Sequence, residues 1–307
     1  MGFACYTHGM RKERGSFAGF RSRIIATLLI LFLASVGNGA TNAVKDTGDL
    51  VVVVQKKVSN GEWLRVKNRT PGDIVVRFQL KGENVRFSEA MPLDRTIAAN
   101  ETVDLVRISG LKAGSRWSYT YSYEARHGNL KAEHQSNVLY QLPYAIRKAY
   151  PVLQGFNGAH SHTNRFMYSV DFAMPKGTPI HAAREGNVVG VKQSSDRGGS
   201  NPDWIDEANY IVIQHFDGTF AHYAHLRHKG VVVAMGQTVK KGQLIGYSGN
   251  TGWSTQPHLH FAVHTVLGAE PFGRTVPIRF FHRYGVVANP KEWVDYECRK
   301  VPRALGE

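Results

Sequence analysis

The chain has 307 residues, 42% of them hydrophobic and 11% aromatic, which allows two domains with buried cores and excludes a mostly disordered protein. Its formal net charge of +14 at pH 7 favours polyanionic surroundings such as nucleic acid, anionic lipid or acidic wall polymer. Of the two cysteines, Cys5 lies near the start of the chain, so loss of a leader would leave only Cys298 and no internal disulfide.

Residues 1–40 have the order of a secretory signal peptide. Basic residues precede an apolar run of 13 residues at 24–36, and small residues follow up to Ala40. A membrane-spanning helix needs about 20 apolar residues, so an uncleaved anchor is the alternative. Both interpretations predict an exported protein, in the periplasm, the cell envelope or the extracellular space. Cleavage after Ala40 would remove five basic residues and Glu13, leaving a net charge of +10, and export would separate the chain from most nucleic acid.

Residues 44–142 are predicted to form a small β-sandwich that acts as an accessory domain. Short β-rich runs alternate there with turn signals such as Asn60-Gly61 and Pro71-Gly72. The predicted strands are residues 50–54, 63–66, 74–80, 103–108 and 117–123. The last strand has an aromatic face made of Trp117, Tyr119, Tyr121 and Tyr123. Core packing explains this face better than a sugar-binding platform, because each strand of a sandwich needs one apolar face.

The pattern breaks around Leu142-Pro143-Tyr144, which marks the predicted domain boundary. Short β-rich runs and turn signals then resume, and Asp217-Gly218 predicts a hairpin. We expect a short helical turn near residues 145–149, an antiparallel β-sheet domain over residues 146–285, and a C-terminal tail over residues 286–307. The predicted fold class is therefore all-β.

Histidines are concentrated in the second half, where 11 of the 14 lie between His160 and His282. Histidine is the commonest protein ligand for zinc and handles protons near neutral pH. In a strand, residues two apart point to the same face, so His258 and His260 should share a pocket. Leu259, between them, would then pack behind the pocket.

Asp171 lies in a short run whose alternate residues are apolar. Aspartate is disfavoured in strands, so metal ligation or loop capping is expected for its carboxylate. His160 and His162 lie upstream, and their spacing does not choose between them. On the predicted hairpin, Tyr223 and His225 should share one face. Three further histidines are interpreted as surface residues: His215, His222 and His228.

Together these residues predict a site of two histidines and one carboxylate, with two more histidines nearby. Three protein ligands leave one position of tetrahedral zinc open to water, as in catalytic sites. A non-haem iron centre uses the same ligand types and is the alternative. The sequence has no His-Glu-x-x-His motif, so histidine would carry the proton transfers.

Four ordered motifs lie within about residues 150–266. They are Ser161-His162, the run from Ser169 to Pro179, Tyr223-Ala224-His225-Leu226, and Gly249-Asn250-Thr251-Gly252 through Pro257-His258-Leu259-His260-Phe261. Jointly they resemble the lysostaphin-type (LytM-like) zinc metalloendopeptidases, a family of bacterial cell-wall peptidases. The resemblance implies one zinc ion held by His162, Asp171 and His260. It also implies that His225 and His258 form the catalytic pair.

One departure from the family pattern concerns the first ligand. In many members the first histidine and the aspartate lie closer together, whereas here eight residues separate His162 from Asp171. We therefore interpret residues 163–168 as part of a loop, and His160 stays the alternative ligand to His162.

The function implied by the resemblance is that of an exported zinc metalloendopeptidase that hydrolyses peptide bonds in peptidoglycan cross-links. Its expected partners are stem peptides and cross-bridges of peptidoglycan, with no nucleic acid. One alternative is a non-catalytic relative that binds the wall or activates an amidase, and another is an exported protease acting on glycine-rich proteins. The loop at residues 194–207 is interpreted either as a groove wall or as a mobile surface insertion.

Overall fold

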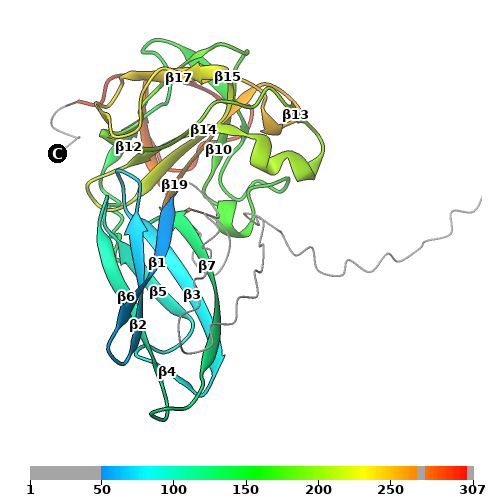
Figure 1. The fold of residues 1–307 in the computed structure, drawn as a ribbon. Coiled ribbons are helices and arrows are strands. Elements are labelled where there is room, and N and C mark those ends of the chain that lie inside the picture. Colours follow the sequence, from blue (N-terminus) through cyan, green and yellow to red (C-terminus); the bar gives the residue numbers. More distant parts are fainter. Residues whose placement is uncertain (1–49, 268–273, 303–307) are drawn as a thin grey trace, which may run out of the picture.

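The computed structural model describes residues 50–267 and 274–302, and the predicted leader lies outside these ranges. Strands dominate both halves of the chain (Figure 1), which confirms the prediction of an all-β protein. The helices in the described ranges are two short 3₁₀ segments, η1 (Asn164–Phe166) and η2 (Pro202–Glu207). No helix in this described part of the chain is long and apolar enough to span a membrane.

The N-terminal part, at the lower end of Figure 1, consists of two sheets whose side chains enter one core. The first sheet has the order β1 (Val51–Val58), β2 (Gly61–Asn68), β6 (Thr102–Gly110), β4 (Val85–Phe87). The second has the order β5 (Leu93–Ile97), β3 (Ile74–Glu83), β7 (Ser118–His127). Val53 and Leu64 from the first sheet and Phe78 from the second are fully buried, because alternate residues of each strand face inward.

The aromatic face of β7 packs into this core. Tyr119 is only 3% exposed, and its hydroxyl donates a hydrogen bond to Glu62. Trp117, Tyr121 and Tyr123 pack against the same cluster of buried side chains. The stripe is therefore part of the hydrophobic core and does not form an open platform for sugars.

The C-terminal part is built on an 11-stranded sheet. Its main path runs β16 (Thr238–Val239), β12 (Gly186–Lys192), β14 (Asn209–Gln214), β15 (Phe220–Val231), β19 (His258–Val266), β10 (Val170–Ala173), β9 (Ala149–Gln154), β23 (Asp295–Glu297). Joined to it are β11 (Pro179–His181), β17 (Leu244–Ser248) and β20 (Arg274–Thr275). Two small sheets complete this part, β13 (Gly198–Gly199) with β18 (Gly252–Trp253), and β22 (Gly285–Val287) with β21 (Arg279–His282) and β8 (Leu139–Gln141).

The expected helical turn near residues 145–149 is wrong. Arg147 has a left-handed φ of 68°, which a helix does not admit, and β9 already begins at Ala149. The backbone instead pairs with the end of the chain. Arg147 N–H donates to the Cys298 carbonyl, and Cys298 N–H donates to the Lys148 carbonyl.

The structure also differs from two of the expected domain boundaries. Tyr140 and Leu142, assigned to the N-terminal domain, are fully buried in the core of the C-terminal part. Tyr296 and Cys298, assigned to a tail, are buried in that same core. Apolar side chains at both ends of the second half are therefore needed to close its hydrophobic core, a contribution that local sequence does not reveal.

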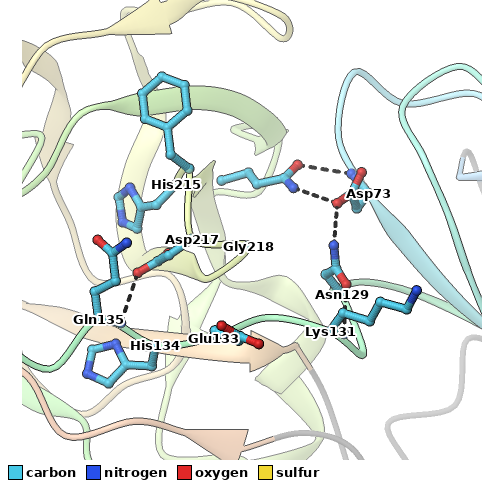
Figure 2. A pocket seen from close by; sticks show the side chains of 11 residues that line it. Asp73, Asn129, Lys131, Glu133, His134, Gln135, His215, Asp217 and Gly218 are labelled. Carbon is cyan, nitrogen blue, oxygen red and sulfur yellow. Dashed lines mark hydrogen bonds between the residues drawn. The ribbon is translucent and has the colours of Figure 1, made fainter.

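Hydrogen bonds join the two parts of the molecule. Asp73 N–H donates to Gln214 Oε1 (3.0 Å), and Asp73 Oδ2 accepts from Gln214 Nε2 (2.9 Å) and Asn129 Nδ2 (2.8 Å). Figure 2 shows Asp73 and Asn129 at this junction, on the wall of a polar pocket. A Cβ on Gly72 would lie 2.3 Å from the Val189 side chain, so glycine permits the close approach of the two parts of the molecule.

The strand β7 also connects to the end of β19, which carries two of the predicted site histidines. Leu267 N–H donates to the His127 carbonyl (2.9 Å), and Asn129 N–H donates to the Thr265 carbonyl (3.1 Å). Gly128 and Val266 form an antiparallel bridge between these two bonds. The N-terminal part is thus anchored directly to the site-bearing strand.

Replacement of Phe261 by alanine should destabilise the C-terminal part by about 3–5 kcal/mol, because it leaves a cavity in a packed core. Phe261 is fully buried, and its ring lies 4.9 Å from Tyr223 and 5.8 Å from Phe280 between ring centroids. Chemical denaturation gives the free energy of unfolding. Phe216→Ala is the matched control, since Phe216 is 89% exposed, and it should change that energy by no more than about 0.5 kcal/mol. Equal effects of the two substitutions would contradict this core assignment.

Candidate metal centre

The candidate site is built on the pairing of β10 with β19. Their antiparallel register places Asp171 directly opposite His260 and carries His258 to the same face. Phe172, the next residue along β10, points to the other face and is fully buried. Directly opposed residues of antiparallel strands have Cβ atoms about 4.5–5.5 Å apart, so the register itself brings carboxylate and imidazole together. His260 Nδ1 lies 2.8 Å from Asp171 Oδ1.

His162 approaches the same carboxylate from the segment that precedes η1. Its side chain is fully buried, and Nε2 lies 3.2 Å from Asp171 Oδ2. On the other side of the ring, Nδ1 lies 2.8 Å from the carbonyl oxygen of Gly155. Since a carbonyl only accepts, Nδ1 carries the proton of the neutral ring and Nε2 keeps its lone pair.

Gln154 determines which of the two upstream histidines faces Asp171. Its Oε1 accepts hydrogen bonds from the backbone N–H groups of His160 (3.0 Å) and Ser161 (3.1 Å), and its Nε2 donates to Ser161 Oγ (2.8 Å). These bonds hold the turn so that the His160 side chain is exposed while His162 is buried. The structure therefore brings His162 to the carboxylate and leaves His160 outside.

The three side chains fit a metal ion. His162, Asp171 and His260 each offer one ligand atom, and these atoms lie within 4.8 Å of one another. His162 Nε2 is buried and has no well-formed hydrogen bond, although a carboxylate oxygen lies nearby. Two acceptors that face each other in a buried site repel unless a cation or a proton lies between them. Two imidazole nitrogens and one carboxylate oxygen are ligands that zinc accepts.

His225 reaches the site through a β-bulge in β15. The pairing with β14 passes from Tyr210 opposite Ala224 to Asn209 opposite Leu226, so His225 has no residue opposite it. Its φ is 63°, in the left-handed region. That conformation costs a non-glycine residue on the order of 1–3 kcal/mol and persists only where its surroundings hold it. A bulge of this kind redirects a side chain.

The bulge overturns the expectation that Tyr223 and His225 share one face. Tyr223 is fully buried in the core behind the sheet, and its hydroxyl accepts a hydrogen bond from Ala183 N–H (2.8 Å). The His225 ring lies instead on the side of His258, with 4.5 Å between ring centroids, and 5.9 Å from His260. Regular alternation would have left His225 in the core.

Both histidines of this pair are oriented by carbonyl groups. His225 Nδ1 lies 2.7 Å from the Thr251 carbonyl oxygen, and His258 Nδ1 lies 2.8 Å from that of Gln256. Each neutral ring therefore carries its proton on Nδ1 and keeps Nε2 as an acceptor. His258 Nε2 lies 3.9 Å from Asp171 Oδ1, so this acceptor faces the three-residue cluster.

Burial and mutual contacts set the charges of the cluster. Burial opposes ionisation of Asp171, but the adjacent imidazoles of His162 and His260 lower its pKa well below the usual value. For His162, burial lowers the pKa, yet the adjacent carboxylate of Asp171 outweighs burial and raises it. Burial, together with the neighbouring His258, lowers the pKa of His225 to about 3, so this imidazole is neutral at physiological pH.

The other histidines differ in part from their predicted surface positions. His228 is exposed as expected, but His215 is 3% exposed, with Nδ1 on the Glu185 carbonyl and its ring against Tyr140. His222 is half-buried, and its ring centroid lies 6.4 Å from that of His260. The supporting role of Gln154 was not predicted, because nothing in its local sequence marks it. Thr251 lies in one of the four motifs, but no role was predicted for it.

Comparison with known proteins gives the family. A family model described as Peptidase family M23 matches residues 165–272, a range that contains Asp171, His225, His258 and His260 and begins just after His162. The chain is 27% identical over 228 residues to the peptidoglycan DD-endopeptidase ShyA of Vibrio cholerae serotype O1, covering 73% of this chain and 46% of that protein. It is 37% identical over 143 residues to the glycyl-glycine endopeptidase ALE-1 of Staphylococcus capitis, covering 46% of this chain and 33% of that protein.

A solved structure is similar in sequence as well. The catalytic domain of lysostaphin from Staphylococcus simulans is 35% identical, and the match covers 45% of this chain and 90% of that domain, with a TM-score of 0.28. The chain spans less than half the length of the curated relatives named above. The C-terminal part of the chain therefore carries a domain of peptidase family M23, a family of metallopeptidases, matched over residues 165–272.

Proposed function

We propose that this protein is an exported zinc metalloendopeptidase that hydrolyses peptide bonds in peptidoglycan cross-links. The observation that carries the proposal is the convergence of His162, Asp171 and His260, with the rings of His225 and His258 beside them. Relatives named peptidoglycan DD-endopeptidase and glycyl-glycine endopeptidase support this substrate class. The predicted leader and the positive charge of the chain are consistent with export toward an acidic wall polymer.

In this proposal His162 Nε2, one carboxylate oxygen of Asp171 and His260 Nδ1 hold a single zinc ion. A bound zinc ion would acidify a coordinated water and polarise the scissile carbonyl. Three protein ligands leave a coordination position for water or substrate, which distinguishes a catalytic from a structural zinc site. Asp171, held ionised by its neighbours, supplies the negative charge that offsets part of the charge of the metal.

His225 and His258 are proposed to handle the protons. Each ring is fixed by a carbonyl at Nδ1, which leaves Nε2 unprotonated, and both rings lie beside the cluster, so the pair can accept the proton of the attacking water. The protonated ring then donates to the departing amine. An imidazole N–H in this position can also stabilise the oxyanion that develops on the substrate carbonyl.

The alternatives differ in what they require of the site. A non-catalytic wall-binding or amidase-activating relative needs neither metal ligands nor a proton-transfer pair, yet both sets of residues are present. An exported protease acting on glycine-rich proteins would use the same chemistry, and the match to a glycyl-glycine endopeptidase keeps this substrate as the second candidate.

The substrate is tested with purified protein lacking residues 1–40 and with defined peptidoglycan. We expect soluble fragments whose masses show cleavage within the peptide cross-links, and we expect a chelator to stop their release and zinc to restore it. Release of glycine peptides from a glycine-rich protein alone would favour the second candidate. If neither peptidoglycan nor the glycine-rich protein gained new amino termini, the enzymatic function would be contradicted.

Metal retention should distinguish the two upstream histidines. His162→Ala removes a proposed ligand, so the purified variant should contain far less zinc than the wild type. Inductively coupled plasma mass spectrometry measures the zinc content. His160→Ala is the matched control, because the His160 side chain is exposed and lies outside the cluster, and it should retain the full metal content. Loss of zinc from His160→Ala with retention in His162→Ala would reverse this ligand assignment.

His258 and His260 should separate metal binding from turnover. His260→Ala should lose both zinc and hydrolysis. His258→Ala should keep most of its zinc while kcat falls roughly 10²- to 10⁴-fold, the usual contribution of a positioned acid or base. Zinc content and steady-state kinetics on the released fragments measure the two effects. Equal loss of zinc in both variants would contradict this division of roles.

A further inference from the structure

The loop that precedes β19 contacts both histidines of the proposed catalytic pair. The Thr251 carbonyl accepts from His225 Nδ1, and the Gln256 carbonyl accepts from His258 Nδ1. Ser254 Oγ also lies near this nitrogen, 3.1 Å from His258 Nδ1. The position of this one loop therefore decides where both imidazoles carry their protons.

Thr251 ties the loop to the bulge that presents His225. Its side chain is buried, with 5% of the residue exposed. Thr251 Oγ1 donates to the carbonyl of Leu226 (2.7 Å), the residue that follows His225, and accepts from the backbone N–H of Asn209 (2.9 Å). The carbonyl and the hydroxyl of one residue thus bind the side chain of His225 and the backbone just beyond it.

Asn209 binds the same Leu226 carbonyl and joins it to Ser195. It is fully buried, its Nδ2 donates to the carbonyls of Ser195 (2.7 Å) and Leu226 (3.3 Å), and its Oδ1 accepts from Ser195 N–H (3.0 Å). The segment after Ser195 then returns to the loop, where β13 pairs with β18 directly after Thr251. The loop at residues 194–207 is therefore bonded to the frame around the histidine pair.

We propose that Thr251 is a positioning residue for hydrolysis, whose hydroxyl holds the Thr251 carbonyl where it keeps the His225 proton on Nδ1 and Nε2 free at the metal centre. This inference rests on the proposed function of the site. Without the hydroxyl, the buried Asn209 N–H loses its acceptor and the left-handed bulge at His225 loses a constraint. The His225 ring can then take the other tautomer, with its proton on Nε2.

The test uses Thr251→Val, which removes the hydroxyl and keeps the shape of the side chain, and Thr251→Ser, which keeps the hydroxyl. Thr178→Val is the matched control. Thr178 is 9% exposed and its hydroxyl also donates to a carbonyl, that of Pro175, but no hydrogen bond among the described residues joins this hydroxyl to the histidine pair. Zinc content, kcat and KM on peptidoglycan fragments, and the ¹⁵N shifts of the His225 ring are measured on the full mature chain.

Thr251→Val should retain zinc and KM while kcat falls roughly 10²-fold, the scale expected when a catalytic group is misplaced by about 1 Å. Its His225 spectrum should show the Nε2–H tautomer, whereas Thr251→Ser and Thr178→Val should keep the wild-type kcat and the Nδ1–H tautomer. If Thr251→Val does not fold, Thr251→Ala carries the same expectations.

A wild-type kcat and tautomer in the folded variant without the hydroxyl would overturn the proposal. So would a loss in Thr251→Ser equal to that in Thr251→Val, since serine retains the hydroxyl. The nitrogen shifts need no turnover. If the wild type cleaves nothing but the tautomer changes as expected, the proposed function fails while the positioning role of Thr251 is supported.

Discussion

The pairing of β10 with β19 is the interaction on which the candidate site depends. It sets Asp171 opposite His260 on one face and turns Phe172 and Leu259 into the core on the other. A slip of one residue would exchange the two faces. It would expose side chains whose burial is worth about 1.5–3 kcal/mol each, and it would bury a carboxylate without its partners. Hydrophobic burial behind the sheet therefore fixes the register that assembles the candidate ligands in front of it.

The site also needs one departure from regular strand geometry. Alternation alone would place His225 in the core beside Tyr223, and the bulge moves it to the face of His258. The left-handed backbone at His225 is unfavourable by itself, so surrounding contacts must hold it. The buried side chains of Asn209 and Thr251 supply these contacts. Local strain at the site is thus balanced by hydrogen bonds from distant parts of the chain.

These two features explain how much could be predicted from sequence. The period of two in a strand predicts that His258 and His260 share a face, and the all-β class follows from short runs between turns. The period of two does not predict the bulge at His225, because the bulge depends on how β15 pairs with β14. Nor does it select His162 over His160, because that choice is made by the side chain of Gln154. The prediction of a helical turn near residues 145–149 was wrong because that backbone forms hydrogen bonds with residues far away in the sequence.

The central claim is that three side chains from separate segments hold one ion and leave it open to solvent. Anomalous diffraction at the zinc absorption edge, from crystals of the zinc-loaded protein, tests this claim directly. The account predicts one strong peak about 2.0–2.2 Å from His162 Nε2, an Asp171 carboxylate oxygen and His260 Nδ1, with no fourth protein ligand. A peak elsewhere, or one closed by a fourth side chain such as His258, would contradict it.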